Sequence, residues 1–138
     1  MYLCSLKLEK NMKKTMLLLM LLATATMVSA DDVMRKEKDG TYIVNTTTLA
    51  QDVEGYNGAT PVEVHIKKDR IVKVVLLKSQ ETPKYKAIIK KSLLPKYEGQ
   101  NVKKGGLQEV DAVSGATFTS DAVKENVRRA VEYYQKHR

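Results

Sequence analysis

Cysteine and histidine are scarce in this chain of 138 residues, which has one cysteine and two histidines. Cys4 lies in a stretch that we expect to be removed, so the remaining domain would hold neither a disulfide nor a thiol. We expect His65 on the outward face of a strand and His137 at the end of a helix, so they do not predict a metal pair. Thiolate chemistry is therefore excluded, and a Ser-His-Asp triad is not predicted.

Long hydrophobic runs are also scarce. Met16–Leu22 is an apolar stretch that follows two lysines and is soon interrupted by Thr24 and Thr26. A membrane-spanning helix needs about 20 apolar residues, so this run is too short. Val28–Ala30 has small residues at the positions that a signal peptidase reads. We expect residues 1–30 to be a secretory signal peptide, with an uncleaved N-terminal anchor as the alternative.

Removal of a signal peptide would place the protein beyond the inner membrane, in the periplasm or the extracellular space. No cysteine follows the predicted cleavage site to carry a lipid, so membrane association would depend on a partner. Residues 31–38 are charged and aperiodic, which predicts a flexible lead-in. Residues 39–138 are then long enough for one small domain but not for two.

Positive charge exceeds negative charge only moderately. The formal net charge of the whole chain is +8, and part of that excess belongs to the predicted signal peptide. In an exported protein a mild excess favours an anionic surface or partner only weakly, and it does not predict nucleic-acid binding.

The predicted domain contains strand-like and helix-like segments. Residues 41–48 are β-branched and aromatic, residues 62–67 alternate, and residues 71–77 are more uniformly apolar. We predict three strands, the last two of which pair as an antiparallel hairpin. Helical spacing of apolar residues predicts one amphipathic helix over residues 84–94, stopped by Pro95, and a second at the C-terminal end. The order of segments predicts an α+β fold, a small antiparallel sheet packed with helices in a single domain.

The stretch Val110–Ser120, VDAVSGATFTS, concentrates small and hydroxyl-bearing residues before the last predicted helix. We predict a short strand over residues 107–110, and Thr119, Ser120 or Asp121 as the helix N-cap. A glycine-containing turn at a helix N-terminus presents unpaired N–H groups and the positive end of the helix dipole, which suits a phosphate. An ordinary turn with a helix cap is the alternative.

The residues of this motif would serve a phosphate site in three ways. Small residues leave the backbone accessible, hydroxyls donate hydrogen bonds, and a carboxylate fixes the loop or orients a hydroxyl or a metal ion. The small residues are Gly115 and Ala116. The hydroxyls belong to Ser114, Thr117, Thr119 and Ser120, and the carboxylate belongs to Asp111.

The run Asp111–Thr117 followed by Thr119 and Ser120 resembles the flavinylation motif of the FMN-binding domain family. This family includes the covalent-flavin domains of the sodium-pumping NADH:quinone oxidoreductase and of the Rnf complex. The resemblance covers about residues 39–134 and includes the segments Asp39–Tyr42, Gly55–Gly58 and Glu81–Pro83, in the order in which such domains carry them. Lys68–Arg70 and Lys84 depart from the family, which often has Asp-Gly and Gly at these places.

The resemblance implies that FMN is joined through its phosphate to the side-chain oxygen of Thr117. A hydroxyl is a weak nucleophile at its own pKa, so a dedicated flavin transferase that takes FMN from FAD with a divalent metal ion would make this phosphoester. Tyr56 is an expected neighbour of the flavin ring. Glu81 and Thr82 would either contact the ring or close a turn.

We therefore expect an exported electron-transfer domain that carries covalent FMN. Its partners would be the flavin transferase and a redox protein in the membrane or outside the cytoplasm. Residues 31–138 do not supply a second substrate pocket, so an electron carrier is expected before a substrate-specific catalyst. Two alternatives remain: a small flavin oxidoreductase that acts on a soluble acceptor, and a cofactor-free interaction domain of the same fold.

Overall fold

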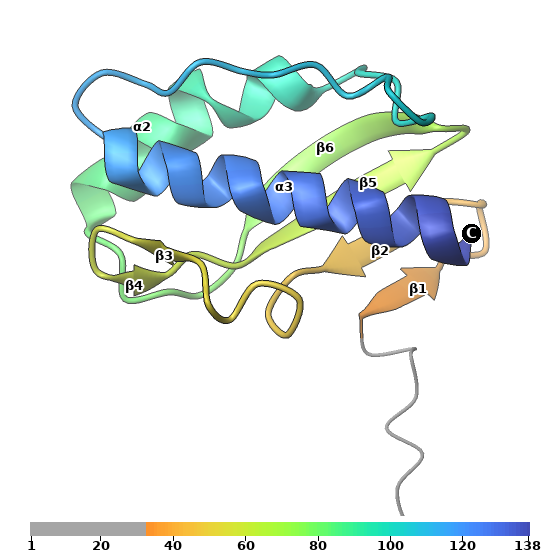
Figure 1. The fold of residues 1–138 in the computed structure, drawn as a ribbon, viewed down its shortest axis with the longest axis horizontal. Coiled ribbons are helices and arrows are strands. Elements are labelled where there is room, and N and C mark those ends of the chain that lie inside the picture. The colour runs from red at the N-terminus through yellow and green to blue at the C-terminus, as the bar shows by residue number, and fades with distance from the viewer. Residues whose placement is uncertain (1–32) are drawn as a thin grey trace, which may run out of the picture.

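The structure, a computed structural model, describes residues 33–138. The predicted signal peptide and the first two residues of the predicted lead-in lie outside this range. A four-stranded antiparallel sheet forms one layer, with strand order β1-β2-β5-β6 (Figure 1). Its strands are β1 (Met34–Lys36), β2 (Tyr42–Asn45), β5 (Val62–Lys67) and β6 (Arg70–Leu76). The predicted antiparallel hairpin and the α+β class are thus confirmed.

Strand β1 corrects one expectation from the sequence. Residues 34–36 were predicted to be part of a flexible lead-in, but Met34 pairs with Val44 and Lys36 pairs with Tyr42 at the edge of the sheet. The charged side chains of this strand are exposed, as is usual for an edge strand, so the strand lacks the apolar pattern that would reveal it.

The helices lie together on one face of the sheet (Figure 1). Helix α2 (Pro83–Ser92) is followed by a short 3-10 helix, η2 (Leu94–Tyr97), and the long helix α3 (Thr117–His137) ends the chain. The predicted apolar face of the last helix is buried in full, at Val123, Val127, Ala130, Val131 and Tyr134. It packs against the inward side chains of β5, which alternate between buried and half-buried as the sequence predicted. Pro95 lies inside η2, three residues after the last residue of α2.

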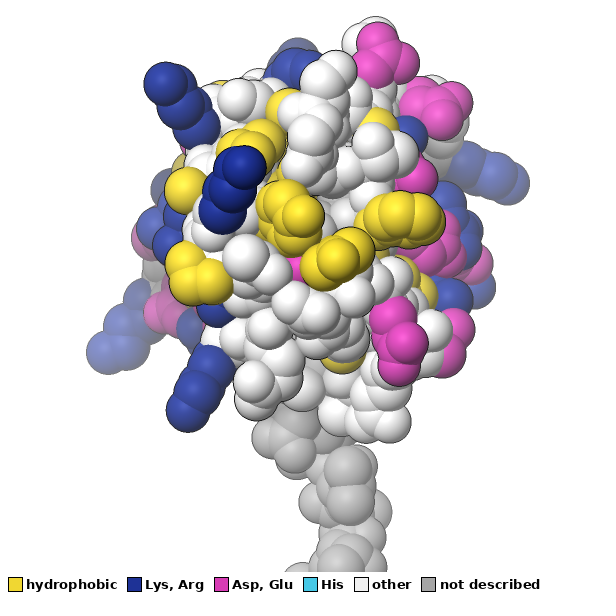
Figure 2. All heavy atoms as spheres, turned by 90° about the vertical axis from the view of Figure 1, so that its left-hand side faces the viewer, with side chains coloured by type: hydrophobic (Ala, Val, Ile, Leu, Met, Phe, Trp, Pro, Cys, Tyr) yellow, Lys and Arg dark blue, Asp and Glu magenta, His cyan; other side chains and the backbone are white. Residues whose placement is uncertain are grey.

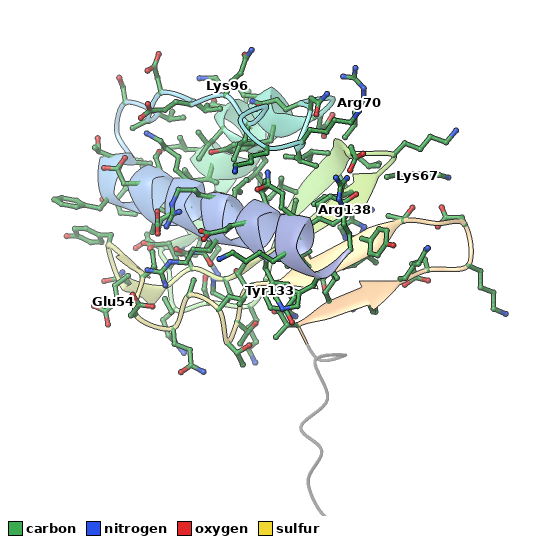
Figure 3. All side chains as sticks on the ribbon, turned by 45° about the vertical axis from the view of Figure 1, so that its right-hand side comes forward. Glu54, Lys67, Arg70, Lys96, Tyr133 and Arg138 are labelled. Carbon is green, nitrogen blue, oxygen red and sulfur yellow. The ribbon has the colours of Figure 1, made fainter. Side chains whose placement is uncertain are left out.

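The turn between β5 and β6 has a backbone conformation that most residues avoid. Lys68 and Asp69 have φ values of 50° and 59°, so this two-residue turn uses the left-handed region without glycine. The Asp69 carboxylate accepts a hydrogen bond from the Tyr134 hydroxyl at 2.8 Å and also binds Arg138. Figure 3 shows Arg138 at the same end of the molecule as Lys67 and Arg70. The hairpin is thereby attached to the C-terminal end of α3.

Two connections complete the fold. Gly55–Gly58, predicted as a loop, is the tip of a small hairpin formed by β3 (Glu54–Gly55) and β4 (Gly58–Ala59). Between η2 and α3 the chain has no helix and no named strand, so the predicted strand over residues 107–110 is wrong. Leu107 and Val110 are apolar, but their segment has no neighbouring strand with which to pair. Figure 1 shows this segment running alongside α3.

Candidate functional site

The N-terminus of α3 begins inside the motif, earlier than the sequence predicted. Thr117 is the first helical residue, and Ala116 occupies the N-cap position without a side-chain hydrogen bond. Thr119 and Ser120 therefore lie in the first turn, and neither they nor Asp121 is the N-cap. Gly115, with φ of +86°, gives the backbone the left-handed turn that leads into the helix. The first N–H groups of the helix are left without a side-chain cap.

The hydroxyls of the motif divide into exposed and buried groups. Ser114 and Thr117 are exposed. The Ser120 hydroxyl is fully buried and accepts a hydrogen bond from the Val113 N–H at 3.0 Å, so it fixes the loop to the helix. The Thr119 hydroxyl is also buried, but it has no hydrogen-bond partner within residues 33–138. A buried hydroxyl without a partner costs free energy, and such groups deserve a functional explanation.

A shallow hollow of about 240 Å³ lies at this helix end, and we call it the Thr117 hollow. It is lined by Tyr56, Tyr85 and residues 115–119. The rings of Tyr56 and Tyr85 meet edge to face, with centroids 5.2 Å apart. Tyr56 and Phe118 are 59% and 69% exposed, although large apolar side chains elsewhere are mostly buried. Figure 2, which faces this end of the molecule, shows a group of hydrophobic side chains here.

Glu81 holds one wall of the Thr117 hollow. Its carboxylate is almost fully buried and accepts hydrogen bonds from the N–H groups of Tyr56, Asn57 and Thr82, at 3.0, 3.4 and 3.3 Å. The Asn57 side chain donates to the Thr82 hydroxyl at 2.8 Å. Glu81 and Thr82 thus close the turn that carries Tyr56, and their contact with a flavin ring stays a prediction.

Gly55 leaves room for this arrangement. A Cβ atom at residue 55 would lie 2.5 Å from the Glu81 carboxylate and 3.1 Å from Thr60. The glycine therefore permits a close approach between the small hairpin and the buried carboxylate.

The structure brings most of the predicted site residues together. Tyr56, Gly115, Ala116, Thr117 and Thr119 line one hollow, and Glu81 and Thr82 support it from behind. Asp111 is exposed, and no hydrogen bond or salt bridge joins it to another residue of the described chain. Sequence reasoning missed Tyr85, which lies within the helix predicted over residues 84–94, and Phe118. The position of Phe118 directly after Thr117 was the available signal.

The donor set at the helix end fits a phosphate. Unpaired N–H groups, the positive end of the helix dipole and the unpartnered Thr119 hydroxyl are the groups that bind phosphate oxygens. Within residues 33–138 no group of three or more His, Cys, Asp or Glu side chains is placed to hold a metal ion. In the same range no helix is both long and apolar enough to cross a membrane.

Comparison with known proteins gives two findings. Residues 55–132 match the model of the FMN-binding domain family. The chain is also similar to one subunit of the Na⁺-translocating ferredoxin:NAD⁺ oxidoreductase complex of Acetobacterium woodii, with 28% identity over 109 residues. That alignment covers 71% of this chain and 53% of the relative, so the chain spans about half the length of that protein.

The family match contains both walls of the Thr117 hollow and most of α3. It includes the small hairpin, the buried Glu81 and the uncapped helix end that fits a phosphate. Since the match extends over more than half of the sequence, the chain belongs to the FMN-binding domain family.

Proposed function

We propose that the protein is an exported electron-transfer domain that carries FMN as a phosphoester on Thr117. The observation that supports this most directly is the position of Thr117 at the first residue of α3. Its exposed hydroxyl lies in the Thr117 hollow, beside unpaired helix N–H groups and the Thr119 hydroxyl. A phosphate on the Thr117 oxygen would lie at the positive end of the helix dipole, next to the unpaired N–H groups.

Attachment would require another protein. The described residues place no histidine and no metal cluster at Thr117 to deprotonate its hydroxyl. A flavin transferase acting on FAD would supply the base and the metal ion. The Thr117 oxygen would form a bond to the FMN phosphorus, the pyrophosphate bond of FAD would break, AMP would leave, and the hydroxyl proton would pass to the base.

The bound flavin would supply the oxidation and reduction chemistry, while this chain orients and exposes it. Thr119 and the first N–H groups of α3 would hold the phosphate. Gly115 and Ala116 would keep the backbone accessible. Glu81 and Thr82 would hold the turn that carries Tyr56, so that one aromatic wall of the hollow stays in place.

Transfer to a partner would follow from the exposure of the site. The relative from Acetobacterium woodii is part of a redox complex, and we infer that this chain also exchanges electrons with a redox protein in or near the membrane. Export would prevent reattachment of a lost cofactor from the cytoplasmic pool, and a covalent bond keeps the flavin at high effective concentration.

The test is intact mass and visible absorbance of the chain produced together with a flavin transferase. Wild type should gain the mass of an FMN phosphoester and the colour of a flavin, and Thr117→Ala should gain neither. Thr48→Ala, which removes an exposed hydroxyl outside the hollow, is the matched control and should behave as wild type. Flavin on Thr117→Ala, or a colourless wild type, would contradict the proposal, and the second result would favour a cofactor-free interaction domain.

A further inference from the structure

A second hollow lies along the side of α3. It has a volume of about 410 Å³, larger than the Thr117 hollow, and we call it the Tyr97 hollow. One wall is the segment Leu107–Val110, and the other is a stripe of α3. The stripe consists of Asp121, Lys124, Glu125 and Arg128, at the spacing of one helix face.

Thr117 belongs to the same stripe, because it lies four residues before Asp121 and seven before Lys124. With a rise of 1.5 Å per residue, the Tyr97 hollow begins within about 10 Å of Thr117 along the helix axis. A group at the N-terminus of α3 and a ligand in this hollow would therefore be neighbours.

Three of the residues that line the Tyr97 hollow are apolar or aromatic: Tyr97, Leu107 and Val110. Tyr97 and Val110 are 3% and 7% exposed, and Leu107 is half-buried. The Tyr134 hydroxyl donates to Asp69, whereas the Tyr97 hydroxyl has no hydrogen-bond partner within residues 33–138. Burial, reinforced by the charge of Glu109, raises the pKa of Tyr97 to about 12. At neutral pH the hydroxyl stays protonated and is a free hydrogen-bond donor.

The charged rim offers little to an ion. Lys124 lies 3.8 Å from both Glu109 and Asp121, and Arg128 binds Glu125 at 2.7 Å and Glu132 at 3.1 Å. Each cation therefore already faces carboxylates. Glu125 is bound by Arg129 as well, at 2.9 Å. An anion would have to displace these carboxylates from Lys124 and Arg128. A cation would meet carboxylates that are already paired with those side chains, so the rim favours a neutral ligand.

We propose that the Tyr97 hollow binds a neutral, flat ring with a carbonyl oxygen, which accepts a hydrogen bond from the Tyr97 hydroxyl. The ring would enter between α3 and the segment Leu107–Val110 and rest on the apolar and aromatic residues of the lining. Two sources share this chemistry: the ring of a flavin carried on Thr117, and a separate quinone-like electron acceptor. Binding of such a ring does not depend on the proposed function, but a role in electron transfer does.

The experiment uses the full chain with Thr117→Ala, which keeps the site free of attached flavin. Duroquinone and riboflavin, both neutral, are titrated separately while backbone amide NMR signals are recorded. We expect at least one of them to cause saturable shifts at Tyr97, Leu107 and Val110. Adding Tyr97→Phe should weaken that binding by about three- to tenfold, the effect of one neutral hydrogen bond. Adding Tyr133→Phe, near the C-terminal end of α3 and outside the lining of both hollows, should leave it unchanged.

Two results would overturn the proposal: no saturable shift at these amides with either ring, or equal binding by the Tyr97→Phe variant. Tyr97→Phe should not lower the melting temperature, because the hydroxyl has no protein partner to lose, and this measurement excludes a folding defect. If flavinylated wild type no longer binds duroquinone, the occupant is its own flavin ring; if it still binds, the occupant is a separate acceptor. A wild type that never gains FMN mass refutes the proposed function and leaves the titration result intact.

Discussion

Glu81 is a carboxylate that is 2% exposed and has no cation bound to it among the described residues. Three backbone N–H groups take the place of a cation, and two of them belong to the turn that carries Tyr56. Hydrogen bonds to a charged group are about twice as strong as neutral ones. The buried charge therefore stabilises the small hairpin, which has only two residues in each strand.

Glu81→Gln should destabilise the protein by about 1–3 kcal/mol. The amide has the shape of the carboxylate, but its NH₂ group cannot accept hydrogen bonds from the backbone N–H groups that surround it. Glu54→Gln, which changes an exposed acid on the same hairpin, should stay within about 0.5 kcal/mol of wild type. Urea unfolding of the flavin-free chain measures both. Equal effects of the two substitutions would show that the buried carboxylate is not what holds the hairpin.

A substitution at Thr119 should separate an effect on protein stability from an effect on FMN attachment. The buried Thr119 hydroxyl has no partner in the described chain, so Thr119→Val should leave the stability of the flavin-free protein unchanged or slightly raised. The same substitution should slow FMN attachment, because a phosphate donor is lost. Initial rates of flavinylation measured by intact mass, together with melting temperatures, test this prediction.

Ser120→Ala is the matched comparison for Thr119→Val. It removes the acceptor of the Val113 N–H and should cost about 1 kcal/mol of stability. If Thr119→Val destabilises as much as Ser120→Ala, the Thr119 hydroxyl has a structural role, contrary to our expectation.

At the scale of elements, α3 carries a network of charged pairs along its exposed side. Hydrogen bonds from Arg128, with a further contribution from Arg129, lower the pKa of Glu125 from 4.5 to about 2. Arg129 also forms two hydrogen bonds to Asp52 and thereby attaches the chain that follows β2 to the helix. A carboxylate with a lowered pKa adds stability above its unfolded pKa and loses it as the pH falls through the folded value.

The unfolding midpoint in urea should therefore fall as the pH is lowered from about 4.5 to about 2. Arg128→Ala should make this fall smaller, since it removes the main cause of the shift in Glu125. Arg35→Ala, on β1, should leave the dependence nearly as it is in wild type. An unchanged slope in the Arg128→Ala protein would rule out Glu125 as the titrating group.

The elements that could be predicted from the sequence are those with a regular apolar pattern. The hairpin β5–β6 and the buried face of α3 follow directly from alternation and helical spacing. The start of α3 was misplaced because Thr119 and Ser120 resemble cap residues, whereas their side chains are used inside the first turn. A local hydroxyl pattern does not reveal which backbone group its hydroxyls will meet.

The candidate site could be predicted only in part, because sequence reasoning brings together residues that are close in the chain. Motif residues that are close in sequence were expected together, and the resemblance to the family added Tyr56, Glu81 and Thr82. The Tyr97 hollow was not foreseen, because Tyr97, Leu107 and Lys124 come together only when the segment before α3 packs alongside it. Neither their spacing nor their residue types indicate that contact.

At the scale of the whole molecule, backbone hydrogen bonds are distributed unevenly. The central strands β2 and β5 are paired on both sides, whereas residues 107–112 belong to no named helix or strand. The segment that leads to Thr117 therefore depends on side-chain contacts, such as the bond of the Gln108 N–H to the Gln100 side chain. Opening of such a segment costs less free energy than opening of the sheet.

Hydrogen exchange followed by mass spectrometry should reflect this distribution. Peptides from β2, β5 and the middle of α3 should exchange slowest, and peptides covering residues 107–115 fastest apart from the chain ends. If a flavin or quinone occupies the Tyr97 hollow, exchange should slow there and stay unchanged in β1. Protection of residues 107–112 equal to that of β5 in the free protein would contradict the expectation.

Lys68 and Asp69 have the same backbone conformation in the turn between β5 and β6, but they should differ in how well they tolerate substitution. Both residues are in the left-handed region, where glycine relieves steric crowding. Lys68 has an exposed side chain, so glycine there should be tolerated or slightly stabilising. Asp69 joins Tyr134 and Arg138 to the hairpin, so glycine there would remove the link between the sheet and the C-terminal end of α3. The first residue of the turn can therefore be replaced without loss of a contact to α3, whereas the second residue belongs to the helix as much as to the hairpin.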